Sequence, residues 1–461
     1  MIRRLVLTTR RATESVLPRG AILLSVLTFA GYAMGLVRDR TFARTFGAGM
    51  ELDAYNAAFV LPELALDVLV AGGLAAPFVP IFLSLRHSDP GARDEAAETF
   101  GQTILTLAVS IMAVSAVFLF ILAPATVNVI APGFDAPARE MYTSLFRLMC
   151  ATPILFAASI ALGEVLVADR RFLFYGLAPL MYNLGIVLGT VLLADRYGIF
   201  AAAIGALLGA TLHLGIRVVG IRRTTFRIRP RLAVRTAAIR EFLWLMLPKM
   251  LAHPIEPLVF LYFTAVATRF ASGSVSSISF ARNFQSVPVS LIGVSIAIAA
   301  FPVLSAAEAA GDRAGFAKVL GRNLATTAVV TTAAAIALFV LSTLLIRVLL
   351  GGGAFDANDV AVTGGLLAVF ALSVPFESLT HLLARGFYAT HNTLIPVLSS
   401  LAGLVVILVV GEGLAPRIGI TAIPLAFTAG SLTKVALLAI AIGPRVRRIG
   451  AGRPAVSRRA P

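Results

Sequence analysis

The amino-acid sequence predicts an all-α polytopic membrane protein with about 12 transmembrane helices, arranged as two pseudo-symmetric six-helix lobes around a central cavity. The observations are an apolar composition, regularly spaced apolar runs and an internal repeat. Of the 461 residues, 58% are hydrophobic and only 13% are charged, and the mean hydropathy is +0.91. Soluble domains carry about 25% charged residues. This composition therefore excludes a large soluble enzyme and a disordered chain.

The apolar runs have the length of membrane spans. A helix needs about 20 mostly apolar residues to cross the hydrocarbon layer. Turn sequences such as Gly47-Ala48-Gly49 and Asp89-Pro90-Gly91 separate the runs. The first run follows a basic stretch, but no polar mature domain follows it, so we expect a retained span rather than a signal peptide. The twelve predicted spans are 20–43, 54–85, 100–126, 140–166, 173–194, 199–220, 241–268, 276–304, 323–350, 360–384, 394–411 and 419–442.

The basic residues predict the topology. Most of the 39 lysines and arginines fall in every second connecting segment, and basic side chains hold such segments on the cytoplasmic side. Twelve spans then leave both termini in the cytoplasm. Attraction to anionic membrane lipids accounts for the excess charge, and no nucleic-acid-binding module accompanies it. The predicted domains are an N-terminal lobe (1–220), a basic cytoplasmic linker (221–240, whose basic run we expect to begin at Arg217), a C-terminal lobe (241–442) and a basic tail (443–461).

The two halves of the chain resemble each other. Phe46 to Gly49, Pro62 and Phe78 to Pro80 recur at a nearly constant offset as Phe270 to Gly273, Pro288 and Phe301-Pro302. An even number of spans per repeat gives both halves the same orientation, with a pseudo-twofold axis along the membrane normal. This is the architecture of an alternating-access transporter, with the pathway between the lobes.

Ionisable residues inside the predicted spans mark candidate site positions, because such residues usually face a cavity or a partner. We expect Arg38 and Arg282 to bind an anionic head group, since guanidinium grips phosphate bidentately. The alternative is ion pairing between helices, for example of Arg38 with Asp53 or Glu63. Candidates for the cavity or for ion coupling are Asp39, Glu63, Asp67, Lys249, His253, Glu256, Glu377 and His381, with Glu164 a further acid in span four. The groups Lys249, His253 and Glu256, and Glu377 with His381, could equally form ordinary buried charge pairs.

Sequence motifs for catalysis are missing. The chain has no Gly-rich phosphate loop followed by Lys-Ser/Thr, no His-Glu-x-x-His and no Cys/His cluster with metal spacing. We therefore predict no enzyme activity, no metal site and no cofactor. Transport would be driven by an ion gradient or the membrane potential, and the sequence does not identify a coupling ion.

Short segments of the first 85 residues carry a family resemblance. Gly35-Leu-Val-Arg38-Asp39, Asp53-Ala54, Phe59-Val-Leu-Pro62 and Ala76-Pro-Phe-Val-Pro80 are similar to the signature region of the MurJ/MviN lipid II flippases. Ala281-Arg282 and Ala384-Arg-Gly-Phe-Tyr388 resemble later family motifs. The resemblance implies the multidrug/oligosaccharidyl-lipid/polysaccharide exporter fold.

The resemblance also implies a function. It points to movement of undecaprenyl-pyrophosphate-linked peptidoglycan precursor, lipid II, from the inner to the outer leaflet during cell-wall synthesis. Arg38, Asp53 and Arg282 correspond to family cavity residues that matter for flipping. The implied partners are a polyprenyl-pyrophosphate-linked saccharide, membrane lipids and other cell-wall synthesis proteins.

Three departures from the family pattern keep alternatives open. Tyr32 and Leu66 stand where the family usually has cavity arginines, and the sequence has twelve predicted spans where better-known members have fourteen. A divergent paralogue that flips another polyprenyl-linked saccharide, and a non-transporting membrane scaffold in cell-envelope synthesis, are the alternatives. An ion-coupled exporter of small cations is a third, if the acidic residues dominate the cavity.

Overall fold

The computed structural model describes residues 19–86, 95–252 and 255–449. Every regular element in these residues is a helix, and one isolated β-bridge joins Gly352 and Phe355. The predicted all-α class is confirmed. By length and composition, nine helical segments of the described chain could cross a membrane, or ten if one bent pair counts as a single span. The number twelve remains a prediction.

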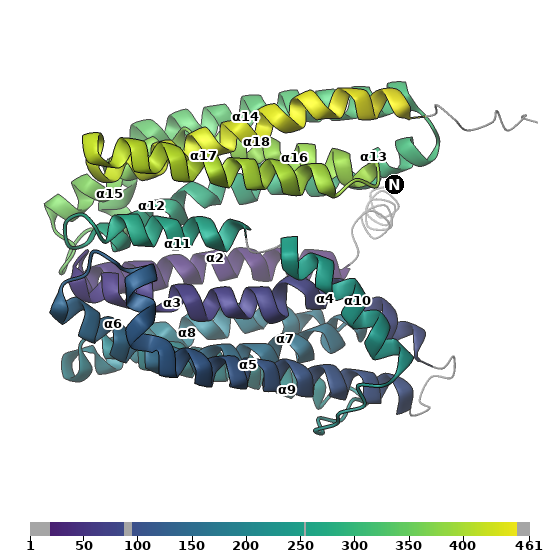
Figure 1. The fold of residues 1–461 in the computed structure, drawn as a ribbon, viewed down its shortest axis with the longest axis horizontal. Helices are drawn as coiled ribbons and strands as arrows, with labels where there is room; N and C mark the ends of the chain where they lie inside the picture. Colours follow the sequence, from purple (N-terminus) through teal and green to yellow (C-terminus); the bar gives the residue numbers. More distant parts are fainter. Residues whose placement is uncertain (1–18, 87–94, 253–254, 450–461) are drawn as a thin grey trace, which may run out of the picture. The chain divides into compact units, whose positions relative to one another are not determined.

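The chain forms two compact units, 1–261 and 262–461. The helices of the first unit are α2 (Arg19–Phe46), α3 (Met50–Leu66), the π-helix η1 (Asp67–Ala71), α4 (Gly72–Ser84), α5 (Glu95–Ile130), α6 (Ala136–Met149), α7 (Thr152–Ala168), α8 (Phe172–Tyr197), α9 (Phe200–Ile221) and α10 (Ala237–Ala252). In Figure 1, α10 lies beside α4, and the two helices are in contact. The sequence predicted residues 241–252 as part of the second lobe, whereas here they pack on the first unit.

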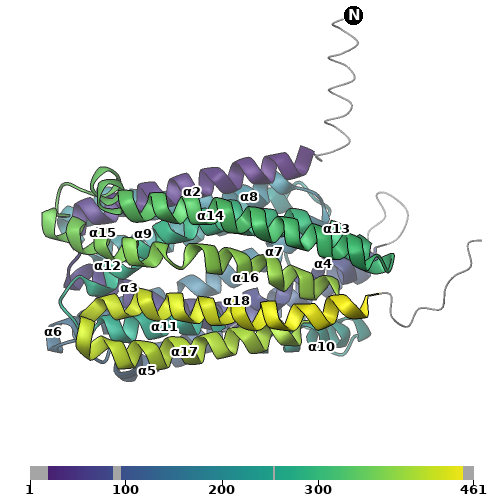
Figure 2. The same ribbon diagram turned by 90° about the horizontal axis from the view of Figure 1, so that it is seen from above.

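The unit boundary falls inside α11 (Ile255–Ala267). The second unit continues with α12 (Ser274–Pro288), the π-helix η2 (Val289–Val294), α13 (Ser295–Ala309), α14 (Arg313–Leu349), α15 (Ala357–Ala371), α16 (Val374–Ala389), α17 (Leu394–Ile418), the 3₁₀ turn η3 (Gly419–Thr421) and α18 (Ala422–Arg448). Helices α15 and α16 are the bent pair, with 43° between them. Figure 2 shows α17 and α18 running side by side.

Both units contain the same irregularity. In the first, Pro62 lies inside α3 and is followed by η1; in the second, Pro288 ends α12 and is followed by η2. Proline removes a backbone donor and crowds the preceding turn, and a π-helical turn is a usual place for such strain to be absorbed. The two segments lie at corresponding positions of the repeat identified in the sequence.

Glycines bring one helix pair of each unit into close contact. A Cβ added at Gly185 in α8 would lie 2.3 Å from the backbone of Gly209 in α9. In the second unit, a Cβ at Gly430 in α18 would lie 2.7 Å from the backbone oxygen of Gly403 in α17. Small residues let membrane helices approach this closely and gain van der Waals contact without help from the hydrophobic effect.

Candidate functional site

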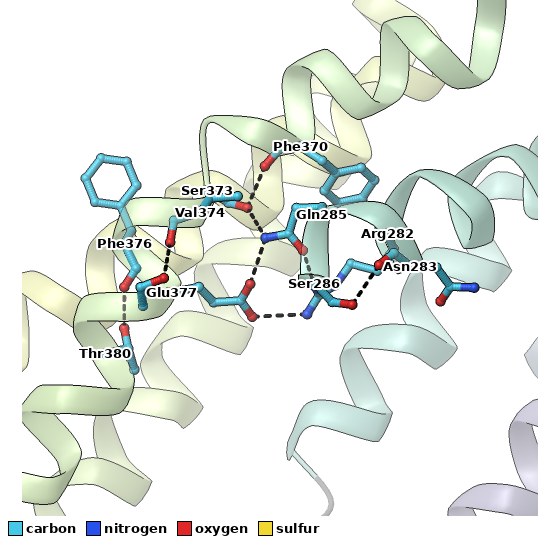
Figure 3. Close-up of polar contacts among 11 residues, drawn as sticks. Arg282, Asn283, Gln285, Ser286, Phe370, Ser373, Val374, Phe376, Glu377 and Thr380 are labelled. Carbon is cyan, nitrogen blue, oxygen red and sulfur yellow. Dashed lines mark hydrogen bonds and ion pairs between the residues drawn. The ribbon is translucent and has the colours of Figure 1, made fainter. Parts of the chain in front are cut away.

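Arg282 lies at the centre of a buried polar cluster in the second unit. Its Nη2 donates to Glu377 Oε1 at 3.0 Å, and the two side chains are only 7% and 8% exposed. Figure 3 shows the two side chains facing each other from α12 and α16. The guanidinium carbon also lies 4.7 Å from the ring centroid of Phe427 on α18. Arg282 therefore contacts two further helices of its own unit.

Gln285 completes this cluster. It stands one helical turn after Arg282, and its Oε1 accepts a hydrogen bond from Arg282 Nη1. Its Nε2 donates to Glu377 Oε2 and to Ser373 Oγ, both at 2.9 Å (Figure 3). Ser373 Oγ in turn donates to the carbonyl of Phe370 at 2.7 Å. The cation is thus matched by a carboxylate whose two oxygens both accept hydrogen bonds, as a buried charge requires.

Arg38 in the first unit has a simpler environment. Its Nε and Nη2 donate to Oδ1 of the adjacent Asp39 at 3.0 and 2.8 Å. The Arg38 side chain is 27% exposed, against 10% for that of Asp39. Asp53, the third residue that the family resemblance selected, is buried near the start of α3. The sequence considered pairing of Arg38 with Asp53 or Glu63, and the ion pair seen here is with Asp39.

The other positions singled out in span two have different environments. Glu63 is exposed on α3, and Asp67 is half-buried at the first position of η1. Leu66 lies in the hydrophobic core of the first unit, whereas Tyr32 on α2 is 45% exposed.

The two groups proposed for ion coupling are only partly described. Lys249 belongs to α10, but its side chain and the whole of His253 lie outside the described residues. Glu256 is exposed in the first turn of α11. On α16, Glu377 is buried against Arg282, whereas His381 one turn later is exposed. A role of these residues in coupling remains a prediction.

A second buried polar cluster was missed by the sequence analysis. Arg217 lies within the predicted span 199–220 but was counted with the basic run of the linker; it belongs to α9, and its side chain is buried. Its Nη1 donates to the Ser159 carbonyl on α7, and Ser159 Oγ is hydrogen-bonded to His213 Nδ1 at 2.7 Å. Glu164 is buried on α7 as well. The four-residue spacing of His213 and Arg217, on a helix otherwise rich in glycine and alanine, was the available signal.

Gln285 and Ser373 were also missed. Gln285 follows Arg282 by three residues, which places both side chains on one face of a helix. Ser373 precedes α16 in sequence, and no local spacing connects it to α12. Only the packing of α16 against α12 brings it to Gln285.

Both arginines can in principle bind a phosphate, because a guanidinium offers five donors in a planar fork. They differ in what a ligand would have to displace. Around Arg38 it would compete with one neighbouring carboxylate. Around Arg282 it would have to replace Glu377 and part of the Gln285 network.

The chain is similar to known proteins over most of its length. The family model described as lipid II flippase MurJ matches residues 42–456. The lipid II flippase MurJ of Burkholderia cenocepacia is 25% identical over 435 residues, 93% of this chain and 84% of that protein. A probable lipid II flippase MurJ of Rhizobium meliloti is 28% identical over 385 residues, 80% of this chain and 70% of that protein.

Solved structures agree on the fold. A lipid II flippase MurJ in an inward closed conformation matches with a TM-score of 0.79 and 23% identity, covering 93% of this chain and 90% of that one. An inward-facing multidrug resistance MATE transporter of the MOP superfamily matches with a TM-score of 0.78 and 13% identity, covering 94% and 100%. The expected exporter fold is confirmed, and with the family match over residues 42–456 the chain belongs to the MurJ family of lipid II flippases.

Proposed function

We propose that this chain is a flippase that moves lipid II, the polyprenyl-pyrophosphate-linked peptidoglycan precursor, from the inner to the outer leaflet of the bacterial inner membrane. The observation that carries the proposal is the family match from residue 42 to residue 456. Arginines at positions 38 and 282, one in each compact unit, give the chemistry that a pyrophosphate requires. The protein is a transporter and not an enzyme, in keeping with its family.

Arg38 and Arg282 are the proposed contacts of the pyrophosphate, with Asp53 tuning the closure around it. Arg38 is the more accessible and would meet the head group first. Arg282 would bind the pyrophosphate only after the hydrogen bond between its Nη2 and Glu377 breaks. Ligand binding would then exchange one anion for another. This exchange keeps the buried guanidinium paired throughout, which avoids the large cost of an isolated buried charge.

Alternating access is the proposed mechanism, with the two units moving relative to each other while the prenyl tail stays in lipid. Both termini are proposed to be cytoplasmic, because the basic segments alternate as the positive-inside rule requires. Other cell-wall synthesis proteins are proposed partners, since the product must be polymerised outside the membrane.

The test is rescue of a bacterium depleted of its own flippase, scored by the lipid II that reaches the outer leaflet. We expect the wild-type chain to restore externalisation and Arg38→Gln to abolish it at normal expression. Arg282 is tested as the double variant Arg282→Met with Glu377→Leu, which removes the ion pair without leaving a buried charge alone. Arg196→Gln, an arginine on α8 whose guanidinium lies over Tyr197, is the matched control and retains transport.

Full externalisation by the Arg38 variant and by the double variant would refute the assigned roles. Failure of the wild-type chain to rescue, with normal insertion and expression, would refute lipid II as the cargo.

The divergent paralogue is the second candidate, and Tyr32 and Leu66 favour it. Leu66 is packed in the core of the first unit, so this chain has no cation at that position to offer a head group. A paralogue would fail in the lipid II assay but externalise another polyprenyl-linked saccharide when supplied with it.

A further inference from the structure

The first unit contains an apolar cavity that the proposed transport function does not use. Its volume is about 500 Å³, and it lies between η1, α5 and α10. Its walls are almost entirely hydrocarbon, and the lining residues include Leu69, Ile104, Ala108, Phe242, Trp244 and Met250. Among the described side chains of the lining, Arg240 in the first turn of α10 is the charged one.

Helix α10 leaves an apolar face uncovered beside this cavity. Phe242 and Met246 are buried against the first unit, and Gly73 allows Met246 to come close to α4. Leu243 is 47% exposed and Trp244 is 70% exposed. A half-open apolar cavity with a tryptophan at its edge fits a hydrocarbon chain, because tryptophan sits at the boundary of headgroup and acyl chains.

An arginine-rich segment, residues 222–236, is held by hydrogen bonds along α5 beside the cavity. Glu98 accepts from the backbone N–H of Arg227 at 3.0 Å, and Thr106 accepts from that of Arg231 at 3.1 Å. Phe226 is buried against Phe82, with ring centroids 6.3 Å apart. Val234 from this segment lines the cavity.

Docking the backbone in this way points the basic side chains outward. Arg227, Arg229, Arg231 and Arg235 are all exposed, and Arg240 at the cavity is exposed as well. Topology alone requires basic residues in such a segment, but it does not require that their backbone be held beside an apolar cavity. Exposed arginines and an apolar cavity wide enough for an acyl chain therefore lie together within one compact unit.

We propose that this cavity binds one acyl chain of an anionic phospholipid, whose headgroup phosphate is held by Arg240. The acyl chain fills the apolar cavity, and the charge of Arg240 at its edge favours an anionic headgroup. A basic residue near an anionic lipid surface contributes enough to favour binding about fivefold. A zwitterionic lipid would occupy the same cavity without that electrostatic contribution to binding.

Trp244 makes the proposal directly measurable, because it is the only tryptophan of the chain and it lines the cavity. The purified full-length protein is reconstituted with phosphatidylglycerol or phosphatidylcholine carrying brominated acyl chains, which quench tryptophan fluorescence on contact. We expect brominated phosphatidylglycerol to quench at about fivefold lower mole fraction than brominated phosphatidylcholine.

Two kinds of variant test the charge at the edge of the cavity and its apolar walls separately. Arg240→Gln should remove most of the headgroup preference, and Ala108→Phe should lower quenching by filling the cavity. Leu107→Phe, also in the lining but half-buried, repeats that test should Ala108→Phe fold poorly. Arg196→Gln, and Val117→Phe on an exposed part of α5, are the matched controls and should behave as wild type.

Equal quenching by the two brominated lipids in the wild-type protein would overturn the proposal. Displacement of brominated phosphatidylglycerol by equimolar undecaprenyl phosphate would also overturn it, because the cavity would then hold a prenyl tail. Neither outcome bears on whether the chain transports lipid II, which the rescue experiment measures separately.

Discussion

Arg38 in the first unit and Arg282 in the second were assigned the same role from the sequence, yet their ion pairs differ in burial and in the helices that they join. Arg38 pairs with its neighbour Asp39 on one helix and keeps 27% of its side chain exposed. Arg282 is 7% exposed and joins α12 to α16 and α18 through Glu377 and Phe427. The first pair joins two neighbours on one helix, whereas the second joins α12 to α16.

This difference determines how each site can respond to a ligand. Arg38 keeps part of its side chain exposed, so a phosphate at this site would compete with the Asp39 carboxylate. Breaking a buried pair by removing one partner costs about 3–5 kcal/mol, because the other charge is left alone in a low dielectric. A ligand at Arg282 must therefore supply its own negative charge as Glu377 withdraws.

The largest expected effect comes from Glu377→Ala. It leaves the Arg282 guanidinium buried without its carboxylate, and we expect about 3–5 kcal/mol of destabilisation. For a unit of this size that corresponds to a fall in Tm of roughly 10 °C. The measurement is thermal unfolding of the purified protein in detergent.

The control for this prediction is the double variant Arg282→Met with Glu377→Leu, which we expect to recover most of the lost Tm. Replacing a buried ion pair with apolar residues of similar volume is often neutral. If the double variant unfolds as early as Glu377→Ala, the pair contributes packing that the charge argument does not explain.

A smaller effect is expected from Gln285→Leu. The substitution removes the hydrogen bonds to Arg282, Glu377 and Ser373 but leaves the ion pair in place. Leaving buried polar atoms unsatisfied costs about 1–3 kcal/mol, so the fall in Tm should lie below that of Glu377→Ala. Asn283→Leu, at an exposed position of the same helix, serves as its control; an equal fall in both variants would contradict the role of Gln285.

The fold class could be predicted from the sequence because the membrane imposes it. Apolar runs of span length must be helical in lipid. The internal repeat also matched Pro62 with Pro288, and a π-helix follows each of these prolines. The burial of Arg217 was less predictable. The sequence counted this residue with the basic run of the linker, but Ser159 on α7 supplies an acceptor that allows it to stay buried.

The candidate site could be predicted only in part, for a related reason. Arg282 and Glu377 were both singled out, since an ionisable residue in a span needs a partner. Their pairing was not, because 95 residues separate them and only the packing of α16 against α12 brings Glu377 to Arg282. Conversely, Arg38 and Asp39 are adjacent in sequence, so their ion pair needs no tertiary structure.

The smallest effect is expected from Asp39→Asn, and it is the sharpest test of the comparison. The asparagine oxygen can still accept from Arg38 Nε and Nη2, so the geometry is kept while the negative charge is lost. Because the Arg38 side chain is 27% exposed, against 7% for that of Arg282, we expect a smaller loss of stability than at Glu377 and a change in Tm of only a few degrees. Glu377→Gln is the matched change in the second unit, since it also keeps an acceptor and removes a charge, and it should lower Tm clearly more. Equal shifts in the two variants would mean that burial does not distinguish the arginines, and Arg38 would then be as much a part of the framework as Arg282.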